Sequence, residues 1–238
     1  IRTKQRSLRW GGFEVVVSKN IDSLFNKLLK FDDFIPISPP ENYDFTDVAS
    51  NIHRAFSAKL PGGTHATFTM KLTEPKNRLF PNTDANVGHI FEIPLNTFNY
   101  EKTKEFYQEK LGLTQILESI SNNGPLHKSW KIPVGEKYSI GIFKSSGSNS
   151  GLGSVEIHGC RKNFIDEDIN NHEELDGGAC IATFLVENIN SLYEYLQNIN
   201  MVLTPIIKTE EQPYNGNFSF IGKGPNNEKI EFVEGWKV

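Results

Sequence analysis

The sequence predicts an α+β fold in which three copies of one β-α-β-β-β module follow one another. Similar letters open the three copies, namely GFEVVV, HIFEIP and CIATFLV, and similar letters close the second and third, SVEIHG and KIEFVEG. The copies recur after roughly 75 to 90 residues, which is well above the range of solenoid repeats. Each copy is therefore expected to be half of a domain rather than one turn of a solenoid.

The first module, residues 10–75, combines strand-forming runs with one amphipathic helix. Asn20 or Asp22 is the expected N-cap, because a short polar side chain accepts hydrogen bonds from the first free backbone N–H groups. The apolar stripe of this helix comprises Ile21, Leu24, Phe25, Leu28 and Leu29. Strands are expected at 11–17, 34–38, 54–60 and 64–72, with a polar loop at 39–47 and a hairpin turn at Pro61-Gly62-Gly63.

The second module, residues 85–160, repeats this order. A strand at 88–94 leads into a helix at 99–111, for which Asn99 is the expected N-cap and Gly112 the C-terminal stop. The remaining strands are expected at 114–120, 130–133, 138–143 and 154–158, with the Ser/Gly-rich run 145–153 as a flexible loop.

The third module, residues 177–238, follows an acidic segment at 161–176 that is expected to be a linker. Its helix is expected at 190–199, with Leu192, Tyr195, Leu196 and Ile199 on the inner side. Its strands are expected at 181–186, 202–207, 217–221 and 229–233, the last two joined by a turn at 224–227.

Composition excludes several classes of function. With 37% hydrophobic and 23% charged residues, the 238-residue chain is typical of a soluble globular protein. A formal net charge of −4 provides no basic field for nucleic acid. No apolar run approaches the roughly 18 residues of a membrane span. Cys160 and Cys180 are too few for a disulfide scaffold, which favours a reducing compartment.

Residues 1–9 form a basic arm, in which Arg2, Lys4, Arg6 and Arg9 precede the first acid, Glu14. This arm is either the edge left by an organellar transit peptide or simply the place where this chain starts. The expected location is the cytoplasm or the matrix of a mitochondrion or plastid, and the protein is not expected to be secreted.

The stretch Val87–Gly112 runs from a strand ending at Pro94 into a helix ending in FYQEKLG, and it resembles the opening of a module in the vicinal oxygen chelate superfamily. This superfamily contains glyoxalases, bleomycin-resistance proteins and extradiol dioxygenases. The segments LPGGTHATFTMKL and MVLTPIIKTEEQPYNGNFSFIGKGPNNEKIEFVEG resemble glyoxalase-domain-containing proteins related to glyoxalase I, which carry four modules. This chain is similar to the last three of them.

The resemblance implies that modules pair side by side and that their sheets curve into a half-barrel around a cleft. Residues 85–238 would form one such paired domain, with a continuous curved sheet. Residues 10–75 would remain an unpaired half domain, whose open sheet face needs a cover. The expected cover is an upstream segment, a partner subunit or the back of the paired domain.

The resemblance also implies a metal site, with one ligand from the first strand and one from the last strand of each paired module. By position these ligands are His89 and Glu156 in the second module and Glu231 in the third, while the fourth position falls at Ile181. His158 lies two residues from Glu156, on the same strand face, and can substitute for the missing ligand. Such a set suits zinc, nickel or iron, and the absence of any metal is equally compatible with it.

Structural roles compete with these assignments. A histidine at the start of a strand, such as His89, is more often a partly exposed, hydrogen-bonded residue than a metal ligand. Glu231 lies among apolar neighbours, where a carboxylate requires a partner unless it faces solvent at a sheet edge.

Two functions follow from the resemblance. In the favoured one, the protein keeps the glyoxalase-like fold without full glyoxalase activity, and it binds a small molecule or serves as a subunit of a larger, organellar assembly. In the alternative, it is a metal-dependent isomerase or lyase of the glyoxalase I type acting on a small thiol–aldehyde adduct, with Glu231 as the catalytic carboxylate that moves a proton.

Overall fold

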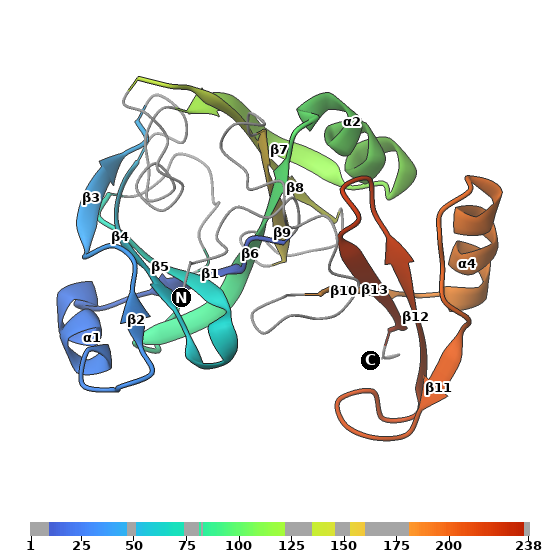
Figure 1. Cartoon of the computed structure of the whole chain (residues 1–238), viewed down its shortest axis with the longest axis horizontal. Helices are drawn as coiled ribbons and strands as arrows, with labels where there is room; N and C mark the ends of the chain where they lie inside the picture. The colour runs from blue at the N-terminus through green and yellow to red at the C-terminus, as the bar shows by residue number, and fades with distance from the viewer. Residues whose placement is uncertain are drawn as a thin grey trace. The chain divides into compact units, whose positions relative to one another are not determined.

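The computed structural model describes residues 10–46, 51–73, 81, 83–121, 135–145, 153–159 and 181–235 (Figure 1). The chain divides into two compact units, residues 1–179 and 180–238, and each is described by itself. Four predicted features lie wholly or mostly outside the described residues: the arm 1–9, the strand 130–133, the loop 145–153 and the linker 161–176. In the described part of the chain, no helix is long and apolar enough to span a bilayer.

The first unit contains the first two modules, and the second unit contains the third. The elements of the first unit are β1 (Phe13–Val17), α1 (Ile21–Leu28), β2 (Ile35–Pro36), β3 (Glu41–Asp44), β4 (Ile52–Lys59), a 3-10 turn (Pro61–Gly63), β5 (His65–Lys71), β6 (Val87–Thr97), α2 (Tyr100–Glu105), a π-helical segment (Phe106–Lys110), β7 (Thr114–Ser121), β8 (Tyr138–Lys144) and β9 (Ser154–Gly159). Those of the second unit are β10 (Ala182–Val186), α4 (Ile189–Asn198), β11 (Ile207–Thr209), β12 (Asn217–Lys223) and β13 (Lys229–Glu234).

Two predicted elements differ from the structure. The expected polar loop at 39–47 contains β3, whose residues have little strand propensity and pair along β4. The strand expected at 202–207 lies later, at β11, because its pairing with Asn217–Ser219 of β12 fixes the position. In both cases pairing with the next strand along the chain overrides the local sequence.

The strands of the first unit form one curved mixed sheet in the order β2-β4-β5-β1-β6-β9-β8-β7, with β3 also paired to β4 (Figure 1). In each module the first strand pairs in parallel with the last, β1 with β5 and β6 with β9. The two first strands, β1 and β6, pair with each other in antiparallel orientation. The joint between the modules is therefore the β1–β6 pair.

This pairing corrects the predicted domain arrangement. Residues 10–75 are not an unpaired half domain, because β1 joins them to the second module. Residues 85–238 do not share one continuous sheet among the described residues, because β10–β13 form a separate sheet in the order β10-β13-β12-β11. The physical reason is the length of β6, whose segment Val87–Glu92 pairs with β1 and whose segment Glu92–Thr97 pairs with β9. The sequence pattern shows only the seven residues 88–94 of this strand.

One face of the nine-stranded sheet packs against α1, and the opposite face is called the inner face below. Side chains alternate along a strand, so Val15 and Val17 join the core on the α1 side, while Glu14 and Val16 project from the inner face. The predicted helix stripe packs into the same core, with Ile21 fully buried and Leu24, Phe25 and Leu28 against it.

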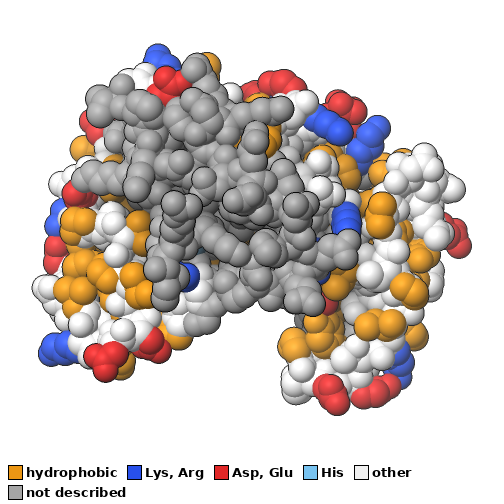
Figure 2. Space-filling view, viewed as in Figure 1, with side chains coloured by type: hydrophobic (Ala, Val, Ile, Leu, Met, Phe, Trp, Pro, Cys, Tyr) orange, Lys and Arg blue, Asp and Glu red, His pale blue; other side chains and the backbone are white. Residues whose placement is uncertain are grey.

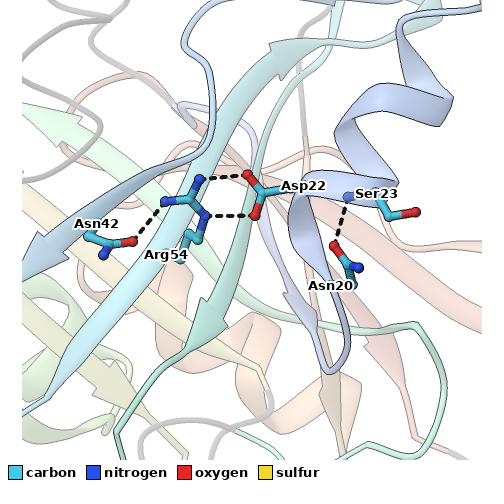
Figure 3. A network of polar contacts seen from close by, with 5 residues as sticks. All are labelled: Asn20, Asp22, Ser23, Asn42 and Arg54. Atoms are coloured by element: carbon cyan, nitrogen blue, oxygen red, sulfur yellow. Dashed lines mark hydrogen bonds and ion pairs between the residues drawn. The ribbon is translucent and has the colours of Figure 1, made fainter.

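The N-terminus of α1 is fixed by two polar contacts (Figure 3). Asn20 is the N-cap, as one of the two predicted alternatives, and its side-chain oxygen accepts a hydrogen bond of 3.0 Å from the backbone N–H of Ser23. Asp22 instead forms a two-pronged ion pair with Arg54 of β4, at 2.6 and 2.9 Å. Arg54 also donates to Asn42 of β3 at 2.9 Å, so it ties the helix to two strands.

Replacing Asn20 with Ala is expected to lower the free energy of unfolding by about 1–2 kcal/mol. The variant loses the cap bond, and Asn20 has a φ of 40°, in the left-handed region where Ala is strained. Replacing Asn20 with Gly removes the cap without this strain, so a loss of only a few tenths of a kcal/mol is expected. Urea denaturation of both variants measures the difference, and equal losses would contradict the prediction.

The helix of the second module begins and stops as predicted. The Asn99 side chain accepts from the backbone N–H of Lys102 at 3.1 Å, and Gly112 follows the helix with a positive φ of 72°. Its last turn, Phe106–Lys110, is π-helical, with Tyr107 fully buried against the ring of Trp10.

In the second unit, α4 covers one face of the four-stranded sheet. Phe184, Phe220 and Phe232 lie in a row on this face, with Phe220 against Tyr193 of the helix. Leu196 is fully buried as predicted, whereas Tyr195 is 41% exposed rather than on the inner side.

Candidate functional site

Three carboxyl groups lie near one another on the inner face of the nine-stranded sheet. Glu14 of β1 is directly opposite Glu92 of β6 in the antiparallel joint. Glu156 of β9 is paired with Pro94, two residues beyond Glu92 on the same face. Glu92 and Glu156 are only 5% and 8% exposed, and Glu14 is partly buried. Glu14, Glu92 and Glu156 are called the carboxyl cluster below.

The cluster favours protonated carboxyl groups. Burial raises the pKa of Glu92 well above its usual range, and the neighbouring carboxylates of Glu156 and Glu14 raise it further. Burial likewise raises the pKa of Glu14, with a further contribution from Glu156. The Thr69 hydroxyl, 3.5 Å from Glu14, opposes this rise by donating to the carboxylate. Glu14 and Glu92 can therefore hold protons at pH values where exposed carboxyl groups have lost theirs.

His158 lies beside the cluster, on the same face of β9 as Glu156. Its Nε2 is 3.1 Å from Oε2 of Glu156. The imidazole is fully buried, and its ring stands at 87° to that of Tyr138 with 5.7 Å between ring centroids. Packing against Tyr138 fixes the imidazole next to Glu156. The role of His158 as a substitute metal ligand stays a prediction.

The structure does not bring His89 to Glu156. His89 is exposed, and it precedes Pro94, the strand partner of Glu156, by five residues. This separation corresponds to roughly 16 Å along the strand. His89 therefore stays outside the carboxyl cluster, because the pairing of β6 with β9 begins only at Glu92.

Glu231 lies in the second unit, where it has hydrogen-bond partners of its own. The hydroxyls of Thr183 and Tyr214 donate to its two carboxylate oxygens at 2.7 and 2.8 Å. The bond to Glu231 raises the pKa of Tyr214. The sequence indicates that the Glu231 carboxylate needs a partner. The hydroxyl groups of Thr183 and Tyr214 are such partners.

Strand register identifies the positions that correspond across the three modules. The equivalent pairs of first-strand and last-strand residues are Val16 with Thr69, Pro94 with Glu156, and Thr183 with Glu231. Two residues earlier lie Glu14 of β1, Glu92 of β6 and Ile181, which directly precedes β10. Ile181 therefore corresponds to Glu92 and not to His89.

Glu14 and Glu92 are the site residues that the sequence reasoning missed. Both lie inside apolar strand segments, FEVVV and IFEIP, where an acid is unfavourable unless it has a partner. The same argument that singles out Glu231 applies to both residues.

A divalent metal ion needs its ligand atoms about 2.0–2.3 Å from one point. In the described ranges, no group of three or more His, Cys, Asp or Glu side chains is arranged to hold such an ion. The carboxyl cluster concentrates negative charge, but as placed its side chains do not form a finished metal site.

Comparison with known structures confirms the vicinal oxygen chelate fold. Glyoxalase I from Zea mays matches 95% of this chain and 67% of its own length, with a TM-score of 0.58 and 13% identity. A candidate dioxygenase from Bacillus subtilis matches 96% of this chain and 63% of its own length, with a TM-score of 0.55 and 12% identity. No protein family model matches, and neither does any curated protein sequence. At these identities the likeness shows the fold alone.

Proposed function

We propose that the protein binds a small, oxygen-rich molecule on the inner face of the nine-stranded sheet, at the carboxyl cluster. The observation that carries the proposal is the convergence of Glu14, Glu92 and Glu156 from three strands onto one buried face. Burying carboxyl groups side by side destabilises a fold, and such arrangements are concentrated at functional sites.

The chemistry of the cluster suits a ligand with carbonyl or hydroxyl oxygens. A carboxyl group that stays neutral donates a hydrogen bond, which an ionised one cannot do. Glu14 and Glu92 supply such donors, because burial favours their protonated forms. Glu156, 3.1 Å from Nε2 of His158, supplies carboxyl oxygens that can accept hydrogen bonds from ligand hydroxyl groups. Binding of this kind requires no complete glyoxalase machinery, in keeping with a protein that has the fold without the full activity.

Binding is expected to weaken as the pH rises through the raised pKa of Glu92, since ionisation removes the donated hydrogen. The probe is a small thiol–aldehyde adduct with an adjacent carbonyl, and calorimetric titration between pH 6 and 9 measures its affinity. Replacing Glu92 with Gln keeps a donor of similar shape, so the variant should bind with little pH dependence. Replacing Glu92 with Leu removes the donor and should weaken binding at least tenfold.

Glu101, exposed on α2, provides the matched control, because Glu101→Gln makes the same chemical change away from the sheet face. That variant should titrate as the wild type does. If Glu92→Leu binds the probe as tightly as Glu101→Gln, the carboxyl cluster is not the ligand site.

The alternative, a metal-dependent isomerase, is favoured by one observation. Mutual repulsion in the carboxyl cluster would be relieved by a cation. Thermal melts with chelator and with added Zn²⁺ or Ni²⁺ distinguish the two proposals. A metal-dependent rise in melting temperature that Glu92→Gln abolishes would favour the isomerase.

A further inference from the structure

We infer that the ligand of the carboxyl cluster is an amphipathic glycoside, whose sugar ring lies over β5 and β4 and whose apolar group lies over β8 and β7. This inference rests on the proposed function and narrows the class of its ligand. The observations that carry it are the unlike side chains of the inner face on the two sides of the cluster.

On the side of the first module, hydroxyl groups continue the row of carboxyl groups across the sheet. Thr67 of β5 is the register partner of Glu14, and Ser57 of β4 is the register partner of Thr67. Thr67 and Ser57 are buried, at 3% and 0% exposure. Because neighbouring strands lie about 4.8 Å apart, the row reaches roughly 10 Å from Glu14 to Ser57. Thr69, two residues further along β5, adds the hydroxyl that donates to Glu14.

The hydroxyl groups of Ser57 and Thr67 can form hydrogen bonds beyond the one between them. Ser57 Oγ and Thr67 Oγ1 are 3.1 Å apart, so one hydroxyl donates to the other. Each hydroxyl has one donated hydrogen and two acceptor lone pairs, which leaves one O–H group and several lone pairs of the pair for a ligand. A sugar hydroxyl both donates and accepts, so it is complementary to this pair.

On the side of the second module, β8 and β7 carry apolar side chains at the corresponding positions. Ile142 is the register partner of Glu156, and Leu117 is the register partner of Ile142. Ile140, the register partner of His158, lies on the same face. The three apolar side chains form no hydrogen bonds and gain free energy from apolar contact, so this side favours an apolar group of the ligand.

The inner face therefore separates two kinds of side chain, with the carboxyl cluster between them. On the surface shown in Figure 2, by contrast, hydrophobic, basic and acidic side chains of the described residues are interspersed. The separation on the inner face indicates a ligand that is itself polar at one end and apolar at the other.

A glycoside fits both sides and the cluster. A free sugar would place its hydroxyl groups against Ile140, Ile142 and Leu117, or leave these side chains without an apolar partner. An apolar molecule would leave the hydroxyl groups of Ser57 and Thr67 without a ligand partner. The oxygen that joins a sugar to its apolar group accepts hydrogen bonds, so it suits the protonated carboxyl groups of the cluster.

Calorimetric titration of the full-length wild type at pH 6 compares phenyl β-glucoside with its two parts, glucose and phenol. The glycoside is expected to bind at least tenfold more tightly than either part, because each part contacts only one side of the cluster. A glycoside that binds no more tightly than glucose or phenol would overturn the inference. This comparison needs no variant, so it holds whether or not the variant below folds.

A double variant, Ser57→Ala with Thr67→Val, tests the hydroxyl side directly. It removes both hydroxyl groups together and leaves neither without its partner, so little loss of melting temperature is expected. The double variant should bind phenyl β-glucoside at least tenfold more weakly and phenol as tightly as the wild type. Ser191→Ala, at an exposed position of α4, is the control and should bind both as the wild type does. Equal affinity of the double variant and the control for the glycoside would contradict the inference.

The thiol–aldehyde adduct distinguishes a wrong ligand class from a wrong ligand site. The adduct carries no sugar, so the double variant should bind it as tightly as the wild type. If the affinity for the adduct depends on Glu92 but the glycoside does not bind, the glycoside inference is wrong and the proposed site stands. If Glu92→Leu leaves the affinity for the adduct unchanged, the proposed function fails and the glycoside inference fails with it.

Discussion

Replacing Glu92 with Gln is expected to raise the free energy of unfolding at pH 8 by about 1–4 kcal/mol, the range found when buried ion pairs are replaced by neutral side chains. In the wild type, Glu92 must either ionise beside Glu14 and Glu156 or hold a proton well above its usual pKa. Each unit by which a pKa is raised corresponds to about 1.4 kcal/mol. The amide removes the charge, keeps the shape and still donates a hydrogen bond.

The raised pKa values determine whether the free energy of unfolding rises or falls with pH. In the folded state the pKa values of Glu14 and Glu92 lie above the ordinary value of 4.5, so the folded protein binds these protons more tightly than the unfolded chain. The stability that they contribute is fully present below pH 4.5 and is lost as the pH rises through the raised values. Wild-type stability should therefore fall over this window, and Glu92→Gln should fall less steeply.

Urea denaturation at pH 5 and at pH 8 measures both effects, with Glu101→Gln as the control at an exposed position. The control should differ from the wild type by less than about 0.5 kcal/mol at either pH, as is usual for surface substitutions. A loss of stability in Glu92→Gln at pH 8 would show that the ionised carboxylate has a favourable partner in the folded protein. The account of the cluster as a site of neutral acids would then be wrong.

Local sequence predicted the elements of this fold, because their signals involve neighbouring residues. Asn20, Asn99 and Gly112 mark helix ends through short-range hydrogen bonds and backbone conformation. Alternation along GFEVVV likewise predicts a strand, which is β1. Such signals identify the modules without showing which two of them join.

The pairing of the modules depends on contacts between distant residues. Glu14 and Glu92 are opposite each other only because β1 meets the first half of β6. The letters of β6 do not indicate that its two halves have different partners. The same limit applies to the predicted site. Likeness of strand openings selects His89, whereas strand register places Glu92 only two residues from Pro94, the partner of Glu156. A search for acids inside apolar strands would have found the cluster without any knowledge of the pairing.

Phe56 forms the centre of the core between α1 and the sheet. It is fully buried on β4, and its ring stacks on that of Phe68 with 4.7 Å between centroids and 14° between planes. Phe25 of α1 and Phe34 meet the same ring edge-on, at 5.0 and 6.4 Å. Three aromatic side chains therefore depend on the ring of Phe56 for their packing.

Replacing Phe56 with Ala is expected to lower the free energy of unfolding by about 3–5 kcal/mol, through lost burial and the cavity left among the other three rings. Urea denaturation, monitored by near-ultraviolet circular dichroism, measures the loss of stability. Phe31→Ala is the control, because Phe31 lies just after α1 but is 62% exposed, and it should cost less than about 0.5 kcal/mol. The loss should also reach the site, since β4 and β5 support β1, which carries Glu14. Hydrogen exchange in Phe56→Ala should therefore speed up in β1 and in the half of β6 that pairs with it, before it does in β7 and β8. Uniform acceleration across all of these strands would mean that the joint between the modules does not depend on this core.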